Sequence, residues 1–279
     1  MIQSIPKYWK DKLFVAYARS NNHPIKLRLL GWLKNILQLD RILAKTDSGV
    51  YMYLNPIDYV QYAILYQGCY EPLTLKLLTS LSKESTNFLD IGSHTGQYAL
   101  EIAKNLNQNG KVIAIEPNPR TFTYLLENIR INKFKNIIPI LGAASDVTSL
   151  IRMQSPPESN WGKSKEYQSN NFIDNNINNT YFTATFKLDN LLLYLNINHI
   201  DIVKIDIEGH EIKALKGLLD SNKYSPKHII FEFIPDSFED AEATVNYLKE
   251  KGYSLYNIVG EVYNKNQNIP ECNLWARKD

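Results

Sequence analysis

Apolar and polar positions along most of the chain follow a pattern that predicts strands followed by helices. From residue 85 on, short apolar runs typical of buried strands are mostly followed by segments with apolar residues at helical spacing. The predicted order is strand 87–91, helix 95–106, strand 111–115, helix 120–132, strands 136–141 and 200–206, helix 209–219, strand 227–233, helix 238–251 and strands 253–259 and 271–277. This alternation predicts an α/β fold, with a mostly parallel sheet covered by helices on both faces.

The beginning of the chain has a different pattern. Residues 5–39 have helical spacing with a break near Pro24, where proline disfavours helix before it. Residues 41–54 predict a β-hairpin. We therefore divide the chain into an N-terminal helical extension with a hairpin, residues 1–84, packed on an α/β domain, residues 85–279.

Residues 154–180 interrupt the alternation with a polar stretch. It opens with Gln154-Ser155-Pro156-Pro157 and contains six asparagines between Asn170 and Thr180. A segment of this composition forms little core. Two interpretations stay open: a lid over the active edge of the sheet, or a polar insertion with no part in the site.

The stretch from Asn87 to Gly96 predicts a strand, a glycine loop and a helix, an arrangement that places a ligand on a helix N-terminus. It is not a dinucleotide fingerprint, because His94 and Gln97 stand where the second and third glycines belong. The spacing Asp-x-Gly-x-x-x-Gly is one we associate with S-adenosylmethionine, whose ammonium group suits Asp90. We expect Asp90 to lie at the exposed carboxyl end of its strand, since a buried carboxylate is costly without hydrogen bonds.

Glu116 ends the next apolar run, Lys111–Glu116. An acid at the end of a second strand can accept hydrogen bonds from both hydroxyls of a ribose. A glycine loop together with this distal acid is a two-point match, which makes coincidence less credible than for either motif alone.

A second acidic constellation surrounds Asp206. On a strand, Lys204, Asp206 and Glu208 share one face, and Gly209 lets the chain turn into the next helix. Asp206 is expected on the same sheet edge as Asp90, which favours a functional site. The structural alternative is an ion pair between Lys204 and Asp206, with Glu208 as a helix cap.

Composition narrows the class of protein. The chain has 279 residues, of which 44% are hydrophobic, and a formal net charge of +2, so it can bury a large core and shows no overall charge preference for partners. We expect no transmembrane helix and no secretory signal. Cys69 and Cys272 make neither a disulfide framework nor a metal cluster, and a cytoplasmic location fits best.

The charge is unevenly placed. Residues 1–45 contain six Lys and three Arg against Asp11 and Asp40, a net charge of +7. One hypothesis is peripheral contact of residues 1–45 with an anionic membrane. Its apolar contacts would be Trp9, Phe14, Tyr17 and Trp32. The other is a helical extension packed on the core with its lysines in water.

Taken together, these motifs resemble the FkbM family of S-adenosylmethionine-dependent methyltransferases. The matching stretches are Phe88–Gly96, Ile115–Pro119 with Asn128 and Asn132, Lys187–Leu191, Val203–Glu211 and, upstream, Gly68-x-Tyr70-Glu71. The resemblance covers about residues 50–235. His94 stands where the family more often has asparagine, which leaves its role open.

The resemblance implies a class I, Rossmann-like methyltransferase fold: a mixed sheet of seven strands in the order 3-2-1-4-5-7-6, with the seventh antiparallel. It also implies O-methylation of a hydroxyl of a sugar, polysaccharide precursor or secondary metabolite, with S-adenosylmethionine as cofactor. The residues it implies for the cofactor are Asp90, Gly92, Ser93, His94 and Gly96 for the methionine part, Glu116 for the ribose, Asn118 beside it, Ala144, Ser145 and Asp146 near the adenine, and Asp206 near the sulfonium.

Four residues are candidates for catalysis: Asp206, Glu208, His210 and Glu232. A sugar hydroxyl is a poor nucleophile, so a base or a metal should assist. Magnesium could bridge Asp206 and Glu232, although we predict no metal site. Without metal, Asp206 or His210 is the expected base, and His210 has an alternative role as the first residue of a helix.

Two other function classes stay open. A nucleic-acid methyltransferase would use the basic N-terminal segment as an arm. Against it, the chain has Asp206-Ile207-Glu208-Gly209 where base methylation usually needs Asn/Asp-Pro-Pro-aromatic, so we predict no nucleic-acid partner. A binding module without catalysis is the third class. The acceptor and the oligomeric state are left open.

Overall fold

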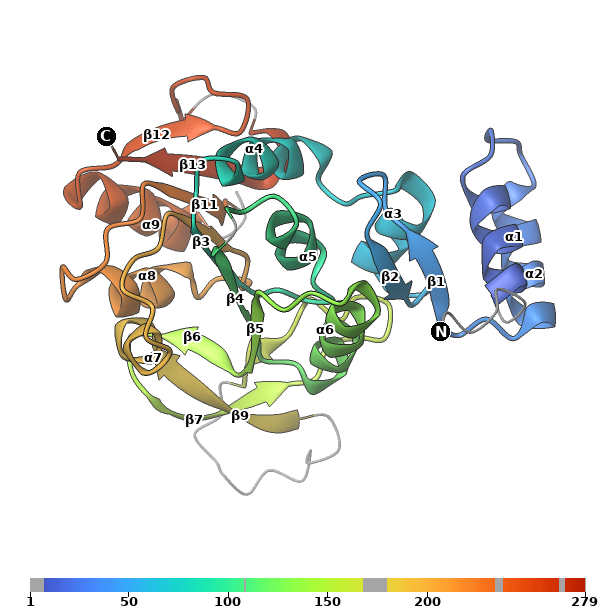
Figure 1. The fold of residues 1–279 in the computed structure, drawn as a ribbon, viewed down its shortest axis with the longest axis horizontal. Helices are drawn as coiled ribbons and strands as arrows, with labels where there is room; N and C mark the ends of the chain where they lie inside the picture. Colours follow the sequence, from blue (N-terminus) through green and yellow to red (C-terminus); the bar gives the residue numbers. More distant parts are fainter. Residues whose placement is uncertain (1–7, 108, 168–179, 234–237, 266–268, 279) are drawn as a thin grey trace.

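The centre of the protein is a seven-stranded sheet with the order β12-β13-β11-β10-β3-β4-β5 (Figure 1). The structure is a computed structural model that describes residues 8–107, 109–167, 180–233, 238–265 and 269–278. The strands are β3 (Asn87–Ile91), β4 (Lys111–Glu116), β5 (Ile137–Leu141), β10 (Ile202–Ile205), β11 (His228–Glu232), β12 (Ser254–Asn257) and β13 (Asn273–Arg277). β13 is antiparallel to both of its neighbours, β11 and β12, and all other pairs in this sheet are parallel. In chain order this is the arrangement 3-2-1-4-5-7-6 that the family resemblance implied.

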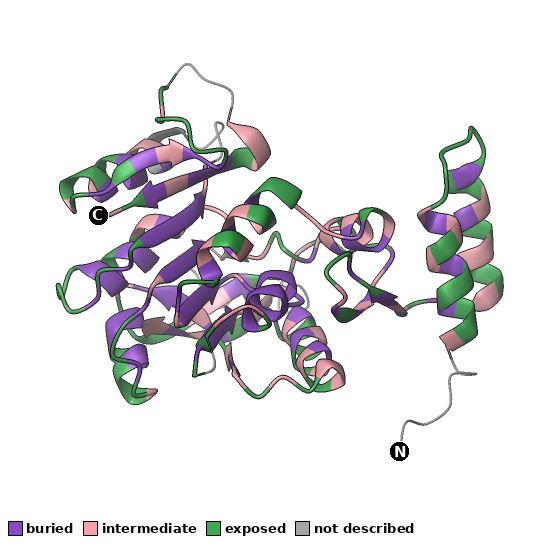
Figure 2. Ribbon diagram, turned by 45° about the horizontal axis from the view of Figure 1, so that its top comes forward, coloured by how far each residue is buried: buried purple, intermediate pink, exposed green. Residues whose placement is uncertain are grey.

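Helices cover both faces of the sheet, as the alternating pattern predicted. One face is covered by α4 (Pro72–Ser82), α5 (Gln97–Ala103) and α6 (Pro119–Asn132), and the other by α7 (Leu188–Tyr194), α8 (Glu211–Leu219) and α9 (Phe238–Glu250). Successive strand residues point to opposite faces, so Phe88 packs with the first group and Leu89 with the second. The buried strands lie between these layers in Figure 2. The ends of the elements predicted from residue 85 on agree with the structure to within three residues, whereas the start predicted at residue 5 lies outside the described residues.

The N-terminal extension contains α1 (Trp9–Ala18), α2 (Lys26–Leu37), the hairpin of β1 (Ile42–Lys45) and β2 (Tyr51–Leu54), and α3 (Tyr59–Gln67). This agrees with the predicted pair of helices and hairpin. Phe14 and Leu30 are buried in the same apolar cluster as Leu100 of α5 and Leu125 of α6. The extension therefore shares a core with the α/β domain, and the domain boundary after residue 84 stays a prediction.

Two asparagines of the family motif attach the hairpin to α6. The side-chain oxygen of Asn128 accepts a hydrogen bond from Tyr53 N at 2.7 Å, and that of Asn132 accepts one from Tyr51 N at 2.9 Å. Their amide nitrogens donate to the carbonyl oxygens of the same two tyrosines. Asparagine presents a donor and an acceptor together, so each side chain satisfies both backbone groups of an edge-strand residue.

A second sheet follows the main one and was not predicted. It has the order β6-β9-β7-β8 and consists of β6 (Ala143–Ser145), β7 (Ser149–Gln154), β8 (Lys165–Glu166) and β9 (Thr180–Lys187). The polar composition of residues 154–180 concealed β8, and residues 168–179 of that stretch lie outside the described residues. Residues 155–167 do not leave the protein as a free polar insertion, because Trp161 is buried.

Two further features complete the fold. A short 3-10 helix, η4 (Pro270–Cys272), precedes β13, and the Glu271 carboxylate accepts hydrogen bonds from the first turn of α4, at Leu73 N and Thr74 N. No helix within the described residues combines the length and the apolar character needed to cross a membrane.

Candidate active site

A cavity of about 1120 Å³ lies at the carboxyl ends of β3, β4, β10 and β11, the edge where open α/β sheets bind ligands. The predicted site residues that line it are Gly92, Ser93, His94, Glu116, Ala144, Asp206, Glu208, His210 and Glu232. Asp90, Gly96, Asn118, Ser145 and Asp146 are not part of this lining.

The glycine loop after β3 needs a residue without a side chain at Gly92. Its φ is 84°, and a Cβ there would lie 1.9 Å from the carbonyl oxygen of Asp206. Gly92 thus lets the ends of β3 and β10 approach each other, in addition to accepting a left-handed backbone. The backbone N–H groups of Gly92 and Ser93 both donate to Ile115 O, which fixes the loop against the end of β4.

Asp90 is buried, with 1% of its surface exposed, so the prediction that it lies at an exposed strand end was wrong. It is the fourth residue of β3, and the neighbouring strand places fully buried Lys204 opposite it. Burial raises the pKa of Asp90 to about 7, although the charge of Lys204 opposes the shift. Its Oδ2 has no hydrogen-bond partner among the described residues. This carboxyl group therefore has an unused acceptor position behind the loop.

Glu116 ends β4 with its carboxylate held by three donors. Asn118 N and the Thr121 hydroxyl donate to Oε1, both at 2.8 Å, and His94 N donates to Oε2 at 2.8 Å. Burial raises the pKa of Glu116, and these hydrogen bonds oppose the shift. Each carboxylate oxygen has two lone pairs, so Oε2 can accept one more hydrogen bond from a ligand in the cavity.

His94 occupies the position that sequence reasoning left open. Its backbone is left-handed, with φ of 50°, a conformation that Asn, Asp and His adopt more readily than most residues. In this conformation its N–H points to Glu116, and its ring nitrogen Nε2 lies 3.7 Å from Asp58 Oδ1. The histidine therefore keeps the turn that an asparagine would allow, and its ring adds a contact to α3.

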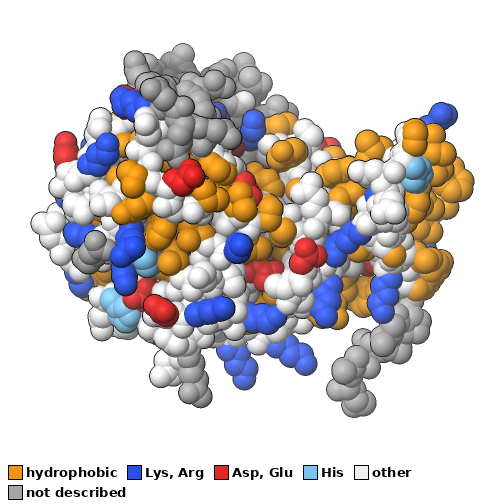
Figure 3. Space-filling model, turned by 90° about the horizontal axis from the view of Figure 1, so that it is seen from above, with side chains coloured by type: hydrophobic (Ala, Val, Ile, Leu, Met, Phe, Trp, Pro, Cys, Tyr) orange, Lys and Arg blue, Asp and Glu red, His pale blue; other side chains and the backbone are white. Residues whose placement is uncertain are grey.

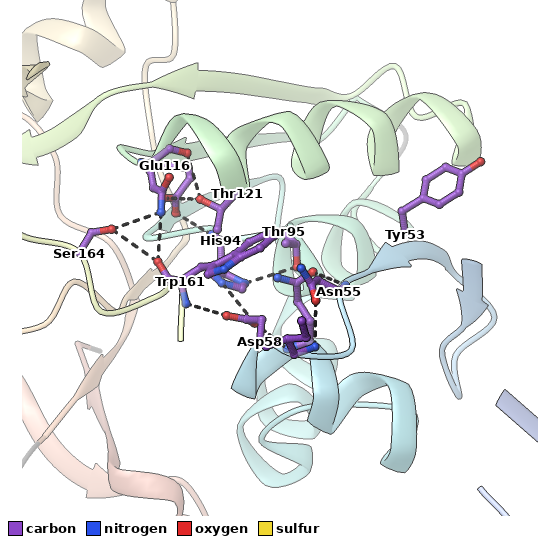
Figure 4. Close-up of polar contacts among 12 residues, drawn as sticks. Tyr53, Asn55, Asp58, His94, Thr95, Glu116, Thr121, Trp161 and Ser164 are labelled. Carbon is purple, nitrogen blue, oxygen red and sulfur yellow. Dashed lines mark hydrogen bonds and ion pairs between the residues drawn. The ribbon is translucent and has the colours of Figure 1, made fainter. Parts of the chain in front are cut away.

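Asp58 was missed by sequence reasoning, and its carboxylate connects three parts of the chain (Figure 4). It is fully buried and caps α3 by accepting a hydrogen bond from Gln61 N at 3.0 Å. Its Oδ2 accepts from Trp161 N at 2.6 Å, while Oδ1 faces His94. From the sequence, Asp58 could be recognised only as a helix cap. Its contact with Trp161 could not be foreseen, because the two residues are far apart along the chain.

Trp161 belongs to a segment, residues 159–167, that borders the cavity; we call it the Trp161 segment. Asn118 caps α6 and also donates from Nδ2 to Trp161 O at 3.2 Å. The Arg120 guanidinium lies 4.7 Å from the centre of the indole ring. The backbone N–H of Trp161 is bound by Asp58 and its carbonyl oxygen by Asn118. These two hydrogen bonds hold the Trp161 segment against the cavity.

Lys204, Asp206 and Glu71 form a charged cluster beneath the cavity. Lys204 is fully buried, and its Nζ lies 3.2 Å from Asp206 Oδ2. Burial disfavours the Lys204 charge, but the carboxylates of Asp206, Glu71 and Glu232 outweigh it and raise the pKa of Lys204. The Tyr98 hydroxyl donates to Glu71 Oε2. The ion pair that we considered as a structural alternative is present, and Asp206 also lines the cavity.

Glu232 lies at the end of β11 beside this cluster. Burial raises its pKa to about 9, Asp206 adds to the shift, and Lys204 opposes it. Its Oε2 is buried and has no hydrogen-bond partner among the described residues. A carboxyl group with this pKa carries a proton at pH 7, so Glu232 can donate a hydrogen bond but is not a base there.

The other two catalytic candidates, Glu208 and His210, lie in the turn between β10 and α8. Glu208 has a φ of 55° and lines the cavity; burial raises its pKa, and so does Asp206. The helix cap that the structural alternative assigned to Glu208 is absent, because the N-cap position of α8 is His210 and no side chain caps it; Glu211 Oε1 accepts from the turn, at Gly209 N. His210 precedes α8, and its Nε2 lies 3.2 Å from Glu166 Oε2.

Several lining residues were not among the predicted site residues. They are Tyr59 and Tyr70 from the N-terminal extension, Gln97, and Lys163, Lys165 and Glu166 from the Trp161 segment. Gln97 accepts from Tyr70 N at 2.7 Å and donates to Tyr70 O at 2.9 Å. The Gly68-x-Tyr70-Glu71 match was the one signal that pointed to this part of the site.

Within the described ranges, no group of three or more His, Cys, Asp or Glu residues is arranged to hold a metal ion. The positive charge next to Asp206 and Glu232 is the Lys204 ammonium group.

A sequence model of the methyltransferase FkbM domain matches residues 90–255. The hexuronic acid methyltransferase AglP of Haloferax volcanii is 28% identical over 144 residues, which is 52% of this chain and 54% of that protein. A tRNA(Phe) (4-demethylwyosine(37)-C(7)) aminocarboxypropyltransferase of Methanocaldococcus jannaschii is 38% identical over 72 residues, 26% of this chain and 28% of that protein. The matches thus span little more than half of one relative and about a quarter of the other.

Among solved structures, an O-methyltransferase from Bacillus cereus in complex with SAH aligns with a TM-score of 0.47 and 12% identity. The alignment covers 75% of this chain and 82% of that one.

Proposed function

The chain belongs to the FkbM family of S-adenosylmethionine-dependent methyltransferases, and from this premise we propose that it methylates a hydroxyl group of a sugar or a related small molecule. The observation that carries the proposal is the pair of carboxyl groups, Asp206 and Glu232, at the edge of the cavity. One is paired with a buried cation, and the other holds a proton at neutral pH. A hydroxyl group both donates and accepts hydrogen bonds, so it can use both partners.

The residues at the ends of β3 and β4 fit the cofactor. Glu116 lines the cavity with a remaining lone pair on Oε2, which suits a ribose hydroxyl, and Asp90 has an unpartnered Oδ2 behind the loop, which suits an ammonium group. Ala144, at the start of the second sheet, lines the same cavity on the side that we assign to the adenine. Bound there, S-adenosylmethionine supplies a methyl group on a positively charged sulfur atom, ready for in-line displacement.

Asp206 is the residue that we propose to accept the hydrogen of the acceptor hydroxyl. The ammonium group of Lys204 stabilises the carboxylate form of Asp206, which is the form that accepts a proton. A fixed position of the acceptor hydroxyl keeps it aligned with the methyl group. Glu232 donates a hydrogen bond and thereby orients the acceptor. Glu208 and His210 border the same region, where we assign them to acceptor contacts.

We further propose an anionic sugar as the acceptor. Lys163 and Lys165 lie at the rim of the cavity, where their charges oppose the rise that burial causes in the pKa of Glu208. Rim lysines attract a carboxylate or a phosphate, while Tyr59 and Tyr70 offer rings for the apolar face of a sugar. The name of the relative from Haloferax volcanii, a hexuronic acid methyltransferase, supports this choice. The free cysteines Cys69 and Cys272 fit a reducing, cytoplasmic location.

Two measurements test the function. Calorimetric titration with S-adenosylhomocysteine, with and without magnesium and EDTA, should give metal-independent binding with micromolar affinity. A transfer assay with labelled methyl donor should then favour hexuronates and their nucleotide-linked forms over the matching neutral hexoses. Binding without transfer to any sugar, but with transfer to tRNA, would replace this proposal by the nucleic-acid alternative. Absence of cofactor binding would favour a binding module without catalysis.

A further inference from the structure

The α1–α2 hairpin exposes an unusual number of large apolar side chains. Those more than half exposed are Trp9 at 51%, Leu13 at 58%, Ile25 at 56%, Leu27 at 68%, Trp32 at 59% and Ile36 at 56%. Figure 3 shows hydrophobic side chains gathered at this end of the molecule. Single exposed apolar residues are normal, whereas a cluster of them marks a surface that binds a partner.

The exposure is not that of a detached helix, because the opposite faces of both helices are packed. Phe14, Ala18 and Leu30 are between 1% and 3% exposed in the core shared with the α/β domain. Arg19 also donates from Nε to Leu65 O at 2.9 Å, which joins α1 to α3. The protein therefore holds the hairpin in place and presents its outer face to solvent.

Charge on this hairpin is positive. Lys10, Lys12 and Arg28 are exposed. Asp11, the one acidic residue between positions 8 and 39, is buried, and its Oδ2 accepts from Leu43 N at 3.2 Å. Exposed cations thus stand beside the apolar side chains with no exposed carboxylate in the hairpin.

We propose that α1 and α2 bind the enzyme to an anionic membrane surface. Apolar side chains insert at the boundary between head groups and acyl chains, while Lys and Arg contact lipid phosphates. A second copy of this chain docked through the same face would cover the apolar residues but would bring the exposed cations of the two copies together. The side chains available for membrane contact differ from those expected from the sequence. Phe14 is in the core, and the Tyr17 hydroxyl is hydrogen-bonded to His23. Leu13, Leu27 and Ile36 are exposed instead.

The first test uses the full chain with vesicles of phosphatidylcholine, and with vesicles in which about a third of the lipid is phosphatidylserine. Co-sedimentation should show partition onto the anionic vesicles at least about tenfold stronger, since each basic residue near such a surface contributes about fivefold. Added salt should weaken it by screening. Equal partition onto both vesicles, or onto neither, would overturn the proposal.

Variants then separate the two components of binding. Replacing Lys10 and Lys12 together by Gln should weaken partition about 30-fold. Trp9→Ser with Trp32→Ser should weaken it about tenfold or more, because two large rings leave the interface. Matched controls far from the hairpin in sequence are Tyr194→Ser on α7, an aromatic residue 86% exposed, and Lys76→Gln on α4. Equal effects of controls and hairpin variants would contradict the assignment.

A second copy of the chain is the competing occupant of this face. Sedimentation velocity without vesicles, at the concentrations used for binding, should show a monomer. A dimer that the paired tryptophan variant dissociates would overturn the membrane proposal. Thermal melts of all variants check that the exposed substitutions leave the fold intact. None of these outcomes depends on the acceptor or on turnover.

Discussion

The two sides of the cavity are built in different ways. On the side that we assign to the cofactor, Gly92 and His94 donate from their backbone N–H groups to Ile115 O and to the Glu116 carboxylate, and Asn118 N donates to the same carboxylate, at 2.8 to 2.9 Å. On the side that we assign to the acceptor, Lys204 is paired with Asp206, and the other carboxyl groups near it, those of Glu71 and Glu232, come from separate parts of the chain. The first side is held by hydrogen bonds within one stretch of the chain, and the second by opposing charges.

This difference has a functional consequence. Preformed hydrogen bonds bind a ligand without reorganisation, so damage to the cofactor side should appear in affinity. Burial and the nearby Asp206 raise the pKa of Glu232 and keep it protonated at pH 7, so damage to the acceptor side should appear in turnover and in pH dependence. The expected effects follow from the largest to the smallest.

Gly92→Ala should have the largest effect. Its Cβ would lie 1.9 Å from Asp206 O, so the ends of β3 and β10 must part. We expect a loss of about 4 kcal/mol or more in the free energy of unfolding, with cofactor binding abolished. Denaturant unfolding and calorimetry measure both.

The matched control is Gly209→Ala, which has a φ of 101° and no atom within 4 Å of a new Cβ. It should cost only the strain of a left-handed backbone, about 1 to 2 kcal/mol. Equal losses in the two variants would show that close approach of the strands is not the reason for Gly92.

Asp206→Asn should reduce kcat by about 10²- to 10⁴-fold, the range typical of a lost proton acceptor. Affinity for S-adenosylhomocysteine should change far less, because Asn keeps the size of the side chain. Steady-state kinetics and calorimetry on the folded variant separate the two effects. Asp40→Asn, an exposed carboxylate outside the cavity lining, serves as the control. If affinity fell as much as kcat, Asp206 would belong to the cofactor side.

Asp58→Ala tests a residue that lies between the two sides of the cavity. It leaves Trp161 N and Gln61 N without their acceptor, which costs about 1 to 3 kcal/mol for each buried donor. A variant that keeps Trp161 as its only tryptophan should show red-shifted fluorescence when Asp58 is replaced, because the indole, now 5% exposed, gains solvent.

The control for this change is Asp40→Ala, an exposed carboxylate in the same extension. Unchanged Trp161 emission in Asp58→Ala would mean that Asn118 and Arg120 hold the segment without Asp58.

Glu232→Gln should have the smallest effect on turnover at pH 7, because glutamine keeps a hydrogen-bond donor, and a visible effect on stability across pH. The folded pKa of Glu232 is raised to about 9, so the folded state binds more protons than the unfolded chain between the ordinary carboxyl pKa and pH 9. Stability from this group is complete below about pH 4.5 and is lost as pH rises through 9.

The wild-type protein should therefore lose stability between pH 6 and 8, with a slope of up to about 1.4 kcal/mol per pH unit from this one proton. Glu232→Gln should remove that part of the slope, as measured by urea unfolding at several pH values. An unchanged slope would contradict a protonated Glu232.

Much of the fold was predictable because its signals are local. The apolar runs of β3, β4 and β10 lie in the printed sequence as continuous stretches, and their alternating faces follow from the period of a strand. The short sheet of β6 to β9 was not predicted, because its pairs join residues far apart and its polar strand carries no apolar run. Glu116 was identified from spacing alone, whereas Asp58 had no motif.

The sequence by itself determined the sheet of the α/β domain, the family and the position of Asp90, Glu116, Asp206 and Glu232 near one edge. Those properties depend on the period of apolar residues and on short motifs. Only the tertiary structure decided that Asp90 is buried, that Glu232 shares its surroundings with Lys204 and Asp206, and that Asp58 holds Trp161. The reason is physical: burial and charge coupling depend on neighbours brought together by packing, and residue spacing along the chain carries no record of them.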